Sequence, residues 1–338
     1  MGNLNDIAHD LIINSGSGND QMVLDDTRDT AANIDGNLTS NEVTGLGIGA
    51  GKSIQYNELE EININLGQGN DEFTVESTSA GTAVTIEGRG GNDRINVKSN
   101  AGTTSIYGDA DSGSFMIGTQ EIVVKEGDDT FLVGSETLSS IQGSNEGGVL
   151  DTINGTLTLL GGGNDDGEDK FFAYNNGSAN EEGGTGDLHR DKLTGFGIGD
   201  AINYNQIESI ALRLGDKDDD LLIRSTIEGT TTVWAGGSSD DGKDVINIVS
   251  ISGTTTIFGE DGKDVIGVNY DRSGQTGYSG IASALEVKGN NGSDEYLIGL
   301  SATNTATIDI NDTADSDDGG SDSVQIFGNN DDNLFLFR

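Results

Sequence analysis

Short turns made of glycine and acidic residues recur along the chain, and they hold the residues best suited to chemistry. One of them is 67-GQGNDEFTV-75, in which two glycines and an Asn-Asp pair precede a run of alternating apolar and polar residues. Glycine at such a turn allows positive φ and lets backbone carbonyls point inward together. Stacked turns of this kind would line a cage of carbonyl and carboxylate oxygens. Such a cage suits calcium, which takes six to eight oxygens at flexible geometry, better than magnesium.

Variants of this turn occur from the first residues to the last, as at 16-GSGND-20 and 259-GEDGKD-264. A single Gly-Asn-Asp segment is also simply a good turn. Many stacked copies with the acid in one phase would repel one another without a counter-ion. In 164-NDDGED-169 and 218-DDD-220 the glycine spacing is broken, so we expect insertions or turns without a cation there. The predicted calcium ligands are Asn19, Asp20, Asn70, Asp71, Asn92, Asp93, Asp128, Asp129, Asp241, Asp244, Asp261, Asp264, Asp294, Asp331 and Asp332.

The spacing of the acidic turns predicts the elements that position them. Asp71 and Asp93 are 22 residues apart, and Asp244 and Asp264 are 20 apart. Each interval contains a strand-like run, a turn rich in Gly and Thr, and a second strand-like run. We therefore predict an all-β fold, a right-handed parallel β-solenoid with rungs of about 20 residues. An antiparallel sandwich could use similar strands, but it does not explain the near-constant interval. The expected strands include 62–65, 84–87, 95–98, 122–125 and 245–249.

A longer repeat overlies the rungs. The segment 44-TGLGIG-49 matches 194-TGFGIG-199 at an offset of 150 residues, and 102-GTTSIYGD-109 matches 253-GTTTIFGE-260 at an offset of 151. The pattern predicts two tandem super-repeats, 1–149 and 150–307, followed by the start of a truncated third at 308–338. Two segments, 25–45 and 175–193, occupy equivalent places in the two copies and break the rung pattern. They are the candidates for a specific binding site.

Composition narrows the class of protein. The chain has 338 residues, with 58 acidic against 17 basic side chains and a formal net charge of −41. This balance argues against nucleic acid as a partner, and it calls for cations to offset self-repulsion. The lack of cysteine excludes disulfides and thiolate metal sites. Apolar residues are spread evenly in short runs, which favours an ordered β-protein over disorder, and none is long enough to span a membrane. The first residues show no signal-peptide pattern.

The acidic turns resemble the glycine-rich nonapeptide repeat of the RTX calcium-binding proteins, G-G-x-G-x-D-x-U-x with U a large apolar residue. The resemblance implies that turn carbonyls and Asp20, Asp71 and Asp93 bind Ca²⁺ between stacked coils of a parallel β-roll. Here the motif occurs once in about 20 residues rather than every nine, so a wider parallel β-helix is expected. The chain also resembles the β-strand repeats of giant bacterial surface and adhesin-like proteins. The matching positions are Gly67, Gly69, Asp71 and Phe73, and again Gly16, Gly18, Asp20 and Met22.

These observations predict a secreted, extracellular structural segment of a surface or adhesin-like protein, or of a filament-forming one, that folds when weak calcium sites fill outside the cell. Its expected partners are neighbouring repeats of a larger chain or further copies joined end to end, with surface glycans as another candidate.

We expect no enzyme. His9 and His189 are far apart, and 187-DLHRDKL-193 is expected to be a solvated loop. The alternatives are a β-helix enzyme acting on polysaccharides, which needs clustered basic residues, and an ice- or carbohydrate-binding module. The threonines of 230-TTTV-233 and 254-TTTI-257 are the candidates for an ice-binding surface.

Overall fold

The structure is a computed structural model. It describes residues 2–109, 114–117, 120–123, 127–134, 148–162, 168–177, 183–236, 242–274, 280–301, 306–311 and 320–329. The chain forms two compact units, the first made of Met1–Tyr174 and Gly197–Glu208 and the second of Asn175–Phe196 and Ser209–Arg338. The two units are defined by contacts within the fold, whereas the predicted super-repeats are defined by similarity within the sequence. The super-repeat boundaries therefore stay a prediction.

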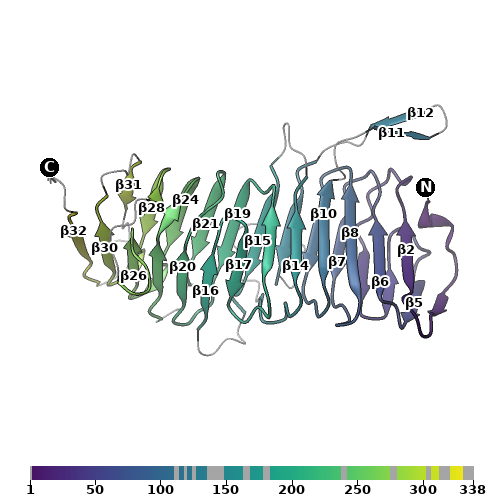
Figure 1. Ribbon diagram of the computed structural model, residues 1–338, viewed down its shortest axis with the longest axis horizontal. Helices are drawn as coiled ribbons and strands as arrows, with labels where there is room; N and C mark the ends of the chain where they lie inside the picture. The colour runs from purple at the N-terminus through teal and green to yellow at the C-terminus, as the bar shows by residue number, and fades with distance from the viewer. Residues whose placement is uncertain are drawn as a thin grey trace. The chain divides into compact units, whose positions relative to one another are not determined.

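The first unit is built of β-strands that mostly pair in parallel. One sheet has the order β1-β5-β4-β3-β7-β9-β13-β15 and the other β2-β6-β8-β10-β14-β18. Figure 1 shows β2, β6, β8, β10 and β14 of the second of these sheets side by side. The elements are η1 (Leu4–Asp6), β1 (Leu11–Asn14), β2 (Gln21–Asp25), β3 (Gly36–Thr39), β4 (Glu42–Thr44), β5 (Ser53–Asn57), β6 (Glu61–Asn65), β7 (Glu72–Val75), β8 (Ala83–Arg89), β9 (Arg94–Val97), β10 (Thr104–Asp109), β11 (Ser114–Ile117), β12 (Gln120–Val123), β13 (Thr130–Val133), β14 (Leu157–Leu160), β15 (Lys170–Tyr174) and β18 (Ile202–Asn205).

The second unit repeats this plan. Its strands have the order β19-β21-β24-β28-β31 in one sheet and β17-β16-β20-β22-β26-β30-β32 in the other. Two short parallel pairs, β23 with β27 and β25 with β29, lie outside these sheets. The strands are β16 (Thr185–Leu188), β17 (Lys192–Gly195), β19 (Ser209–Arg213), β20 (Asp220–Ile223), β21 (Thr230–Trp234), β22 (Val245–Ile248), β23 (Ser250–Ile251), β24 (Thr254–Phe258), β25 (Asp261–Gly262), β26 (Val265–Val268), β27 (Gly280–Ile281), β28 (Leu285–Lys288), β29 (Asn291–Gly292), β30 (Glu295–Gly299), β31 (Ile308–Ile310) and β32 (Ser323–Phe327).

Alternation of apolar and polar residues explains why these segments form strands with one buried face. In β6 and β8 every second residue is buried, as a period of two requires. Parallel pairing then places like residues over like, so that Ile64 lies opposite Ile86 and Ile86 opposite Ile106. The predicted all-β fold with parallel strands is confirmed, and strands appear where 62–65, 84–87, 95–98 and 245–249 were expected. Of the segment 122–125, the structure describes residues 122 and 123, which belong to β12.

The two predicted insertions contribute antiparallel strands to the sheets. In 25–45, β3 pairs antiparallel with β4 and parallel with β7, and in 175–193 and the residues after it, β16 pairs with β17 and β20 in the same way. The expectation that 187–193 forms a solvated loop is therefore wrong, since this segment makes a hairpin whose turn is at 189–191. A Cβ on Gly186 would lie 2.0 Å from the Phe196 ring, so glycine there lets the ring pack on the strand.

Trp234 belongs to a row of side chains on the half-buried side of β19, β21, β24 and β28. Its ring stacks on Phe258 with centroids 5.7 Å apart and planes 5° apart. The Arg213 guanidinium lies 4.3 Å from the centroid of the Trp234 ring, and the Lys288 ammonium 4.9 Å from that of Phe258. The outer faces of both rings are thus covered by cations.

Replacing Trp234 with Ala should lower the free energy of unfolding of the second unit by about 1–2 kcal/mol, because both the aromatic stack and the cation–π contact are lost. Trp234→Phe should keep most of that energy, since a second phenylalanine can still stack on Phe258. Urea unfolding followed by circular dichroism measures the difference. Equal losses for the two variants would contradict the stacking account.

Candidate functional site: a column of buried aspartates

In the first unit, the aspartates of the acidic turns point inward and form a hydrogen-bonded column. The backbone N–H of Asp71 donates to Oδ1 of Asp93, that of Asp93 to Oδ1 of Asp129, and that of Asp129 to Oδ1 of Asp169, at 2.7, 2.7 and 2.8 Å. All four side chains are at most 1% exposed. The column is closed at one side by Asn33, whose N–H donates to Asp71, and at the other by the Glu208 carboxylate, which accepts from Asp169.

The second unit contains a column of the same design. Here the N–H of each column aspartate donates to Oδ1 of the following column member, in the order Asp219, Asp244, Asp264, Asp294 and Asp322. The donor–acceptor distances are 2.7, 2.9, 2.9 and 3.1 Å, and the last acceptor is the exposed Asp322. Each aspartate therefore links its own turn to the turn of the next rung. One carboxylate oxygen replaces the water that the neighbouring N–H would otherwise need.

A glycine four or five residues before each of several aspartates shapes the space around the second carboxylate oxygen. At a spacing of four, the Gly67 and Gly215 N–H groups donate to Oδ2 of Asp71 and Asp219, both at 3.0 Å. At a spacing of five, a Cβ on the glycine would collide with Oδ2, at 2.5 Å for Gly88 beside Asp93. The glycine Cα–H therefore faces the carboxylate, a weak hydrogen-bond donor.

In the turns where the first glycine precedes the aspartate by five residues, a further glycine between them has a different role. Gly91, Gly262 and Gly292 adopt φ values of 112°, 143° and 136°. This confirms the use of glycine for positive φ in these turns, whereas Gly67 and Gly69 of the turn at 67–71 are outside the positive-φ set. The first glycine of each turn is thus required by close packing and the middle one by backbone conformation.

Burial raises the pKa of three column carboxylates, those of Asp71, Asp93 and Asp129. Desolvation, reinforced by the charge of Asp129, raises the pKa of Asp93 to about 9 against the partial offset of its hydrogen bond to the Asp71 N–H. Desolvation and the charges of Asp109 and Asp169 raise the pKa of Asp129 to about 8, again partly offset by a backbone N–H. Oδ2 of Asp93 and of Asp129 is buried without a hydrogen-bond partner. These oxygens are the atoms at which a proton or a cation would relieve the burial of charge.

Two column members were missed in the sequence. Asp169 and Asp219 lie in the segments with irregular glycine spacing, yet both are buried and hydrogen-bonded like the other column members. Each of these segments therefore supplies a column aspartate, while the expectation that they hold insertions or turns without a cation stays a prediction. For Asp219 a signal was present, because Gly215 precedes it by four residues just as Gly67 precedes Asp71.

The other predicted ligands that the structure describes lie outside the two hydrogen-bonded columns. Oδ1 of Asn70 accepts from the Asn92 N–H at 3.1 Å, and Oδ1 of Asp128 accepts from the Glu168 N–H at 3.0 Å. The exposed members of the set are Asn19, Asn70, Asn92 and Asp128, whereas Asp20 and Asp261 are half-buried. Asp241, Asp331 and Asp332 lie outside the described residues.

The fit of the columns to calcium is partial. Asp93 and Asp129 each offer one buried oxygen without a hydrogen-bond partner. Backbone carbonyls converge on the same places, since the Cβ position of Gly108 is 2.1 Å from Oδ2 of Asp129 and 2.4 Å from the Gly161 carbonyl oxygen. Among the described residues, no three His, Cys, Asp or Glu side chains are grouped to hold a metal ion. A cation here would be held by single carboxylates and turn carbonyls, the ligand types that calcium prefers.

Comparison with known proteins adds no relative to this picture. The chain matches no protein-family model, and no curated protein is significantly similar to it. Within the part of the chain that the structure describes, there is no helix with the length and hydrophobicity needed to cross a bilayer.

Gly88→Ala should destabilise the first unit by about 1–3 kcal/mol, the usual cost of overpacking, although Gly88 is outside the positive-φ set. The added methyl would meet Oδ2 of Asp93 and the Gly108 carbonyl oxygen at 2.5 and 2.3 Å. Gly81→Ala is the matched control, because no atom lies within 4 Å of its Cβ position. Urea midpoints for the two variants provide the comparison, and a neutral Gly88→Ala would refute the packing role of this glycine.

In calcium-free buffer, the melting temperature should fall as the pH rises from about 5 to 9. The folded-state pKa values of Asp93 and Asp129 lie above the ordinary 3.8. The folded chain thus keeps protons that the unfolded chain releases above pH 4, and their stabilising effect is lost as the pH rises toward these values.

Asp129→Asn should flatten this dependence, since the amide keeps the Oδ1 acceptor and removes one titrating group. Thermal melts at stepped pH values in EGTA test both statements. A melting temperature that rises over this range would contradict them.

Proposed function

We propose that this chain is a structural segment of a secreted surface or filament protein, folded as a right-handed parallel β-solenoid. The observation that supports this proposal is the column of aspartates, because each buried Asp is used to bond one rung to the next. Contacts of this kind join nearest neighbours along a stack, which is the organisation of solenoid proteins. Such a stack yields a stiff spacer rather than a single reaction centre.

Charge pairing on the outside of the strands supports the same function. Basic side chains pair with acidic ones of the same or the adjacent rung. Lys98 and Glu76, which directly follow β9 and β7, are 2.8 Å apart, and Lys288 and Glu286 on β28 are 3.0 Å apart. An enzyme acting on acidic polysaccharides would need such bases gathered in a groove. A sugar-binding platform would need open aromatic faces, whereas the Trp234 and Phe258 rings are stacked on each other and capped by cations.

Calcium is the proposed stabilising ligand. The net charge of −41 must be offset, and the free oxygens of Asp93 and Asp129 together with turn carbonyls are the candidate ligands. A ligand that binds the folded state alone stabilises it by RT ln(1 + [L]/Kd), about 1.4 kcal/mol per site at tenfold excess. Weak sites would thus couple folding to the higher calcium level outside cells.

The edges of the sheets support continuation of the stack by neighbouring repeats or by further copies. In the first unit, the edge strand β2 leaves Val23 53% exposed, and β1 leaves Leu11 and Ile12 exposed. In the second unit, the edge strand β32 leaves Val324 52% exposed. Strand edges with exposed apolar side chains are templates for further pairing, so we propose end-to-end association as the mode of assembly.

Calcium titration of the EGTA-treated chain, followed by far-UV circular dichroism, thermal melting and light scattering, tests this function. Calcium should raise the melting temperature, magnesium should do so less, and scattering should rise if copies join at their edges. Asp93→Asn should reduce the calcium effect, because it removes one carboxylate from the column. Asp35→Asn carries the same charge change on an exposed side chain and serves as the control. Identical melts in EGTA and in calcium would remove calcium from the proposal.

A further inference from the structure

Residues 269–274 of the second unit leave the bend after β26 and cross the outward face of the sheet. The Tyr270 N–H donates to the Ile248 carbonyl at 3.2 Å, and the Asn269 side-chain amide donates to the Gly299 carbonyl at 2.6 Å. The Tyr270 ring lies 5.8 Å from that of Phe327 on β32. This segment, which we call the strap, therefore contacts several rungs at once.

The strap covers side chains that alternation places on the outside of the sheet. Leu222 and Asn247 lie opposite each other on β20 and β22, and Asn247 lies opposite Gly267 on β26. Leu222 and Asn247 are nevertheless buried. A Cβ on Gly267 would lie 2.6 Å from Oδ1 of Asn247 and 2.8 Å from Cβ of Tyr270. Glycine at this position thus lets the strap lie directly on the strands.

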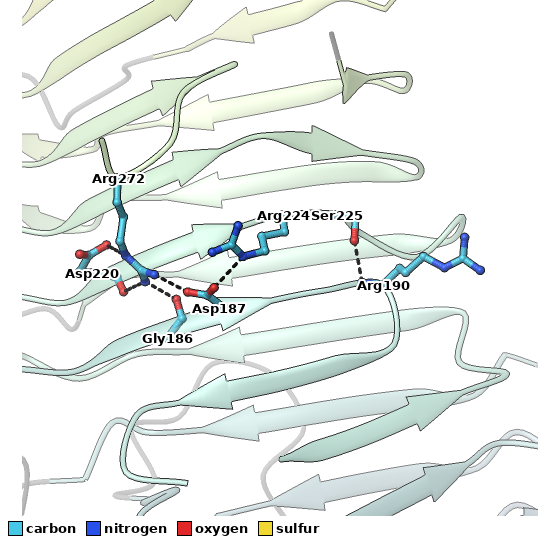
Figure 2. A network of polar contacts seen from close by, with 7 residues as sticks. All are labelled: Gly186, Asp187, Arg190, Asp220, Arg224, Ser225 and Arg272. Atoms are coloured by element: carbon cyan, nitrogen blue, oxygen red, sulfur yellow. Dashed lines mark hydrogen bonds and ion pairs between the residues drawn. The ribbon is translucent and has the colours of Figure 1, made fainter. Parts of the chain in front are cut away.

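Arg272 anchors the strap to two neighbouring strands. Its Nε donates to Oδ1 of Asp220 at 2.8 Å, and Nη2 donates to the Gly186 and Asp220 carbonyls at 2.6 and 3.0 Å. Nη1 forms an ion pair with Asp187, which also accepts from Nε of Arg224 at 2.7 Å. Figure 2 shows the Arg272 guanidinium between the two carboxylates, while the Arg190 side chain points away from them.

The contact of Arg272 joins parts of the chain that are far apart in the sequence. Arg272 is 85 residues from Asp187 and 52 from Asp220. Asp187 and Asp220 occupy diagonal positions on β16 and β20, since Thr185 pairs with Asp220 and Asp187 with Leu222. Two carboxylates so placed repel each other. The planar guanidinium can bond both at once, which an ammonium group cannot do with the same geometry. Burial raises the pKa of Asp187, but hydrogen bonds and charge from Arg224 and Arg272 outweigh it and leave that pKa lowered.

We propose that residues 269–274 act as an external strap on the second unit, in which the Arg272 guanidinium is a built-in counter-ion that holds β16 and β20 together without a bound metal. The strap works on the outward face, whereas the aspartate column works inside. It is therefore independent of the calcium sites proposed above. It stabilises rungs that are distant in the sequence as one block.

Hydrogen exchange followed by mass spectrometry in EGTA tests this proposal on the full chain. In Arg272→Gln, amides of β16 and β20 should exchange about fivefold faster or more, because a forked charge-assisted contact is lost. Amides of β3 and β7 in the first unit should keep their rates. Arg272→Lys should fall between Gln and the parent, since it keeps the charge and loses the fork.

Arg190→Gln is the matched control. Its backbone N–H bonds Ser225, and among the described residues its guanidinium makes no ion pair. Unchanged exchange in Arg272→Gln, or the same change in Arg190→Gln, would overturn the proposal. So would equal acceleration in both units, which would show general destabilisation rather than loss of a local strap.

Discussion

The hydrogen bond from one aspartate's N–H to the next aspartate's carboxylate is the interaction on which the structure depends. A buried carboxylate is costly unless its oxygens are bonded, and here the partner is the backbone of the neighbouring rung. This geometry requires the side chain to point inward. It also requires a glycine beside it, because a Cβ at Gly88 would occupy the space of the Asp93 carboxylate. The acidic glycine turn is therefore a packing unit as well as a bend.

Stacking by such contacts makes each rung depend on its neighbours, and this has an electrostatic consequence. Carboxylates in one column are desolvated and also repel one another, so that burial first and the charge of Asp129 second raise the pKa of Asp93. A proton or a cation at Oδ2 would relieve the same repulsion, so pH and calcium are two routes to one effect. Stabilisation by protons is lost as the pH rises, whereas stabilisation by calcium grows, since binding of a metal needs the deprotonated carboxylate.

On the outward faces of the sheets, the negative charge of the carboxylates is offset in a different way. There, carboxylates are neutralised by side chains from the chain itself, as Asp187 is by Arg224 and Arg272. The row of Arg213, Trp234, Phe258 and Lys288 on another sheet surface combines cations with stacked rings. Both arrangements connect neighbouring rungs. A stack stabilised inside by backbone–carboxylate bonds and outside by such clamps suits a load-bearing spacer, the function proposed above.

The sequence by itself determined most strands and their parallel stacking, because period-two alternation is a local property of the chain. The expected interval of about 20 residues holds between Asp71 and Asp93 and between Asp244 and Asp264, whereas other neighbours in the columns are 25 to 40 residues apart. The sequence could not determine where the Asp93 and Asp129 side chains point. An inward carboxylate is favourable only when a neighbouring rung supplies the N–H, and that rung lies 22 to 40 residues away. For the same reason Asp169 was missed despite its place in the column. The hairpin at 187–193 and the reach of Arg272 to Asp187 likewise depend on partners distant in the sequence. These side-chain directions and contacts are determined by the tertiary structure, since only packing brings residues so distant in the sequence within bonding distance.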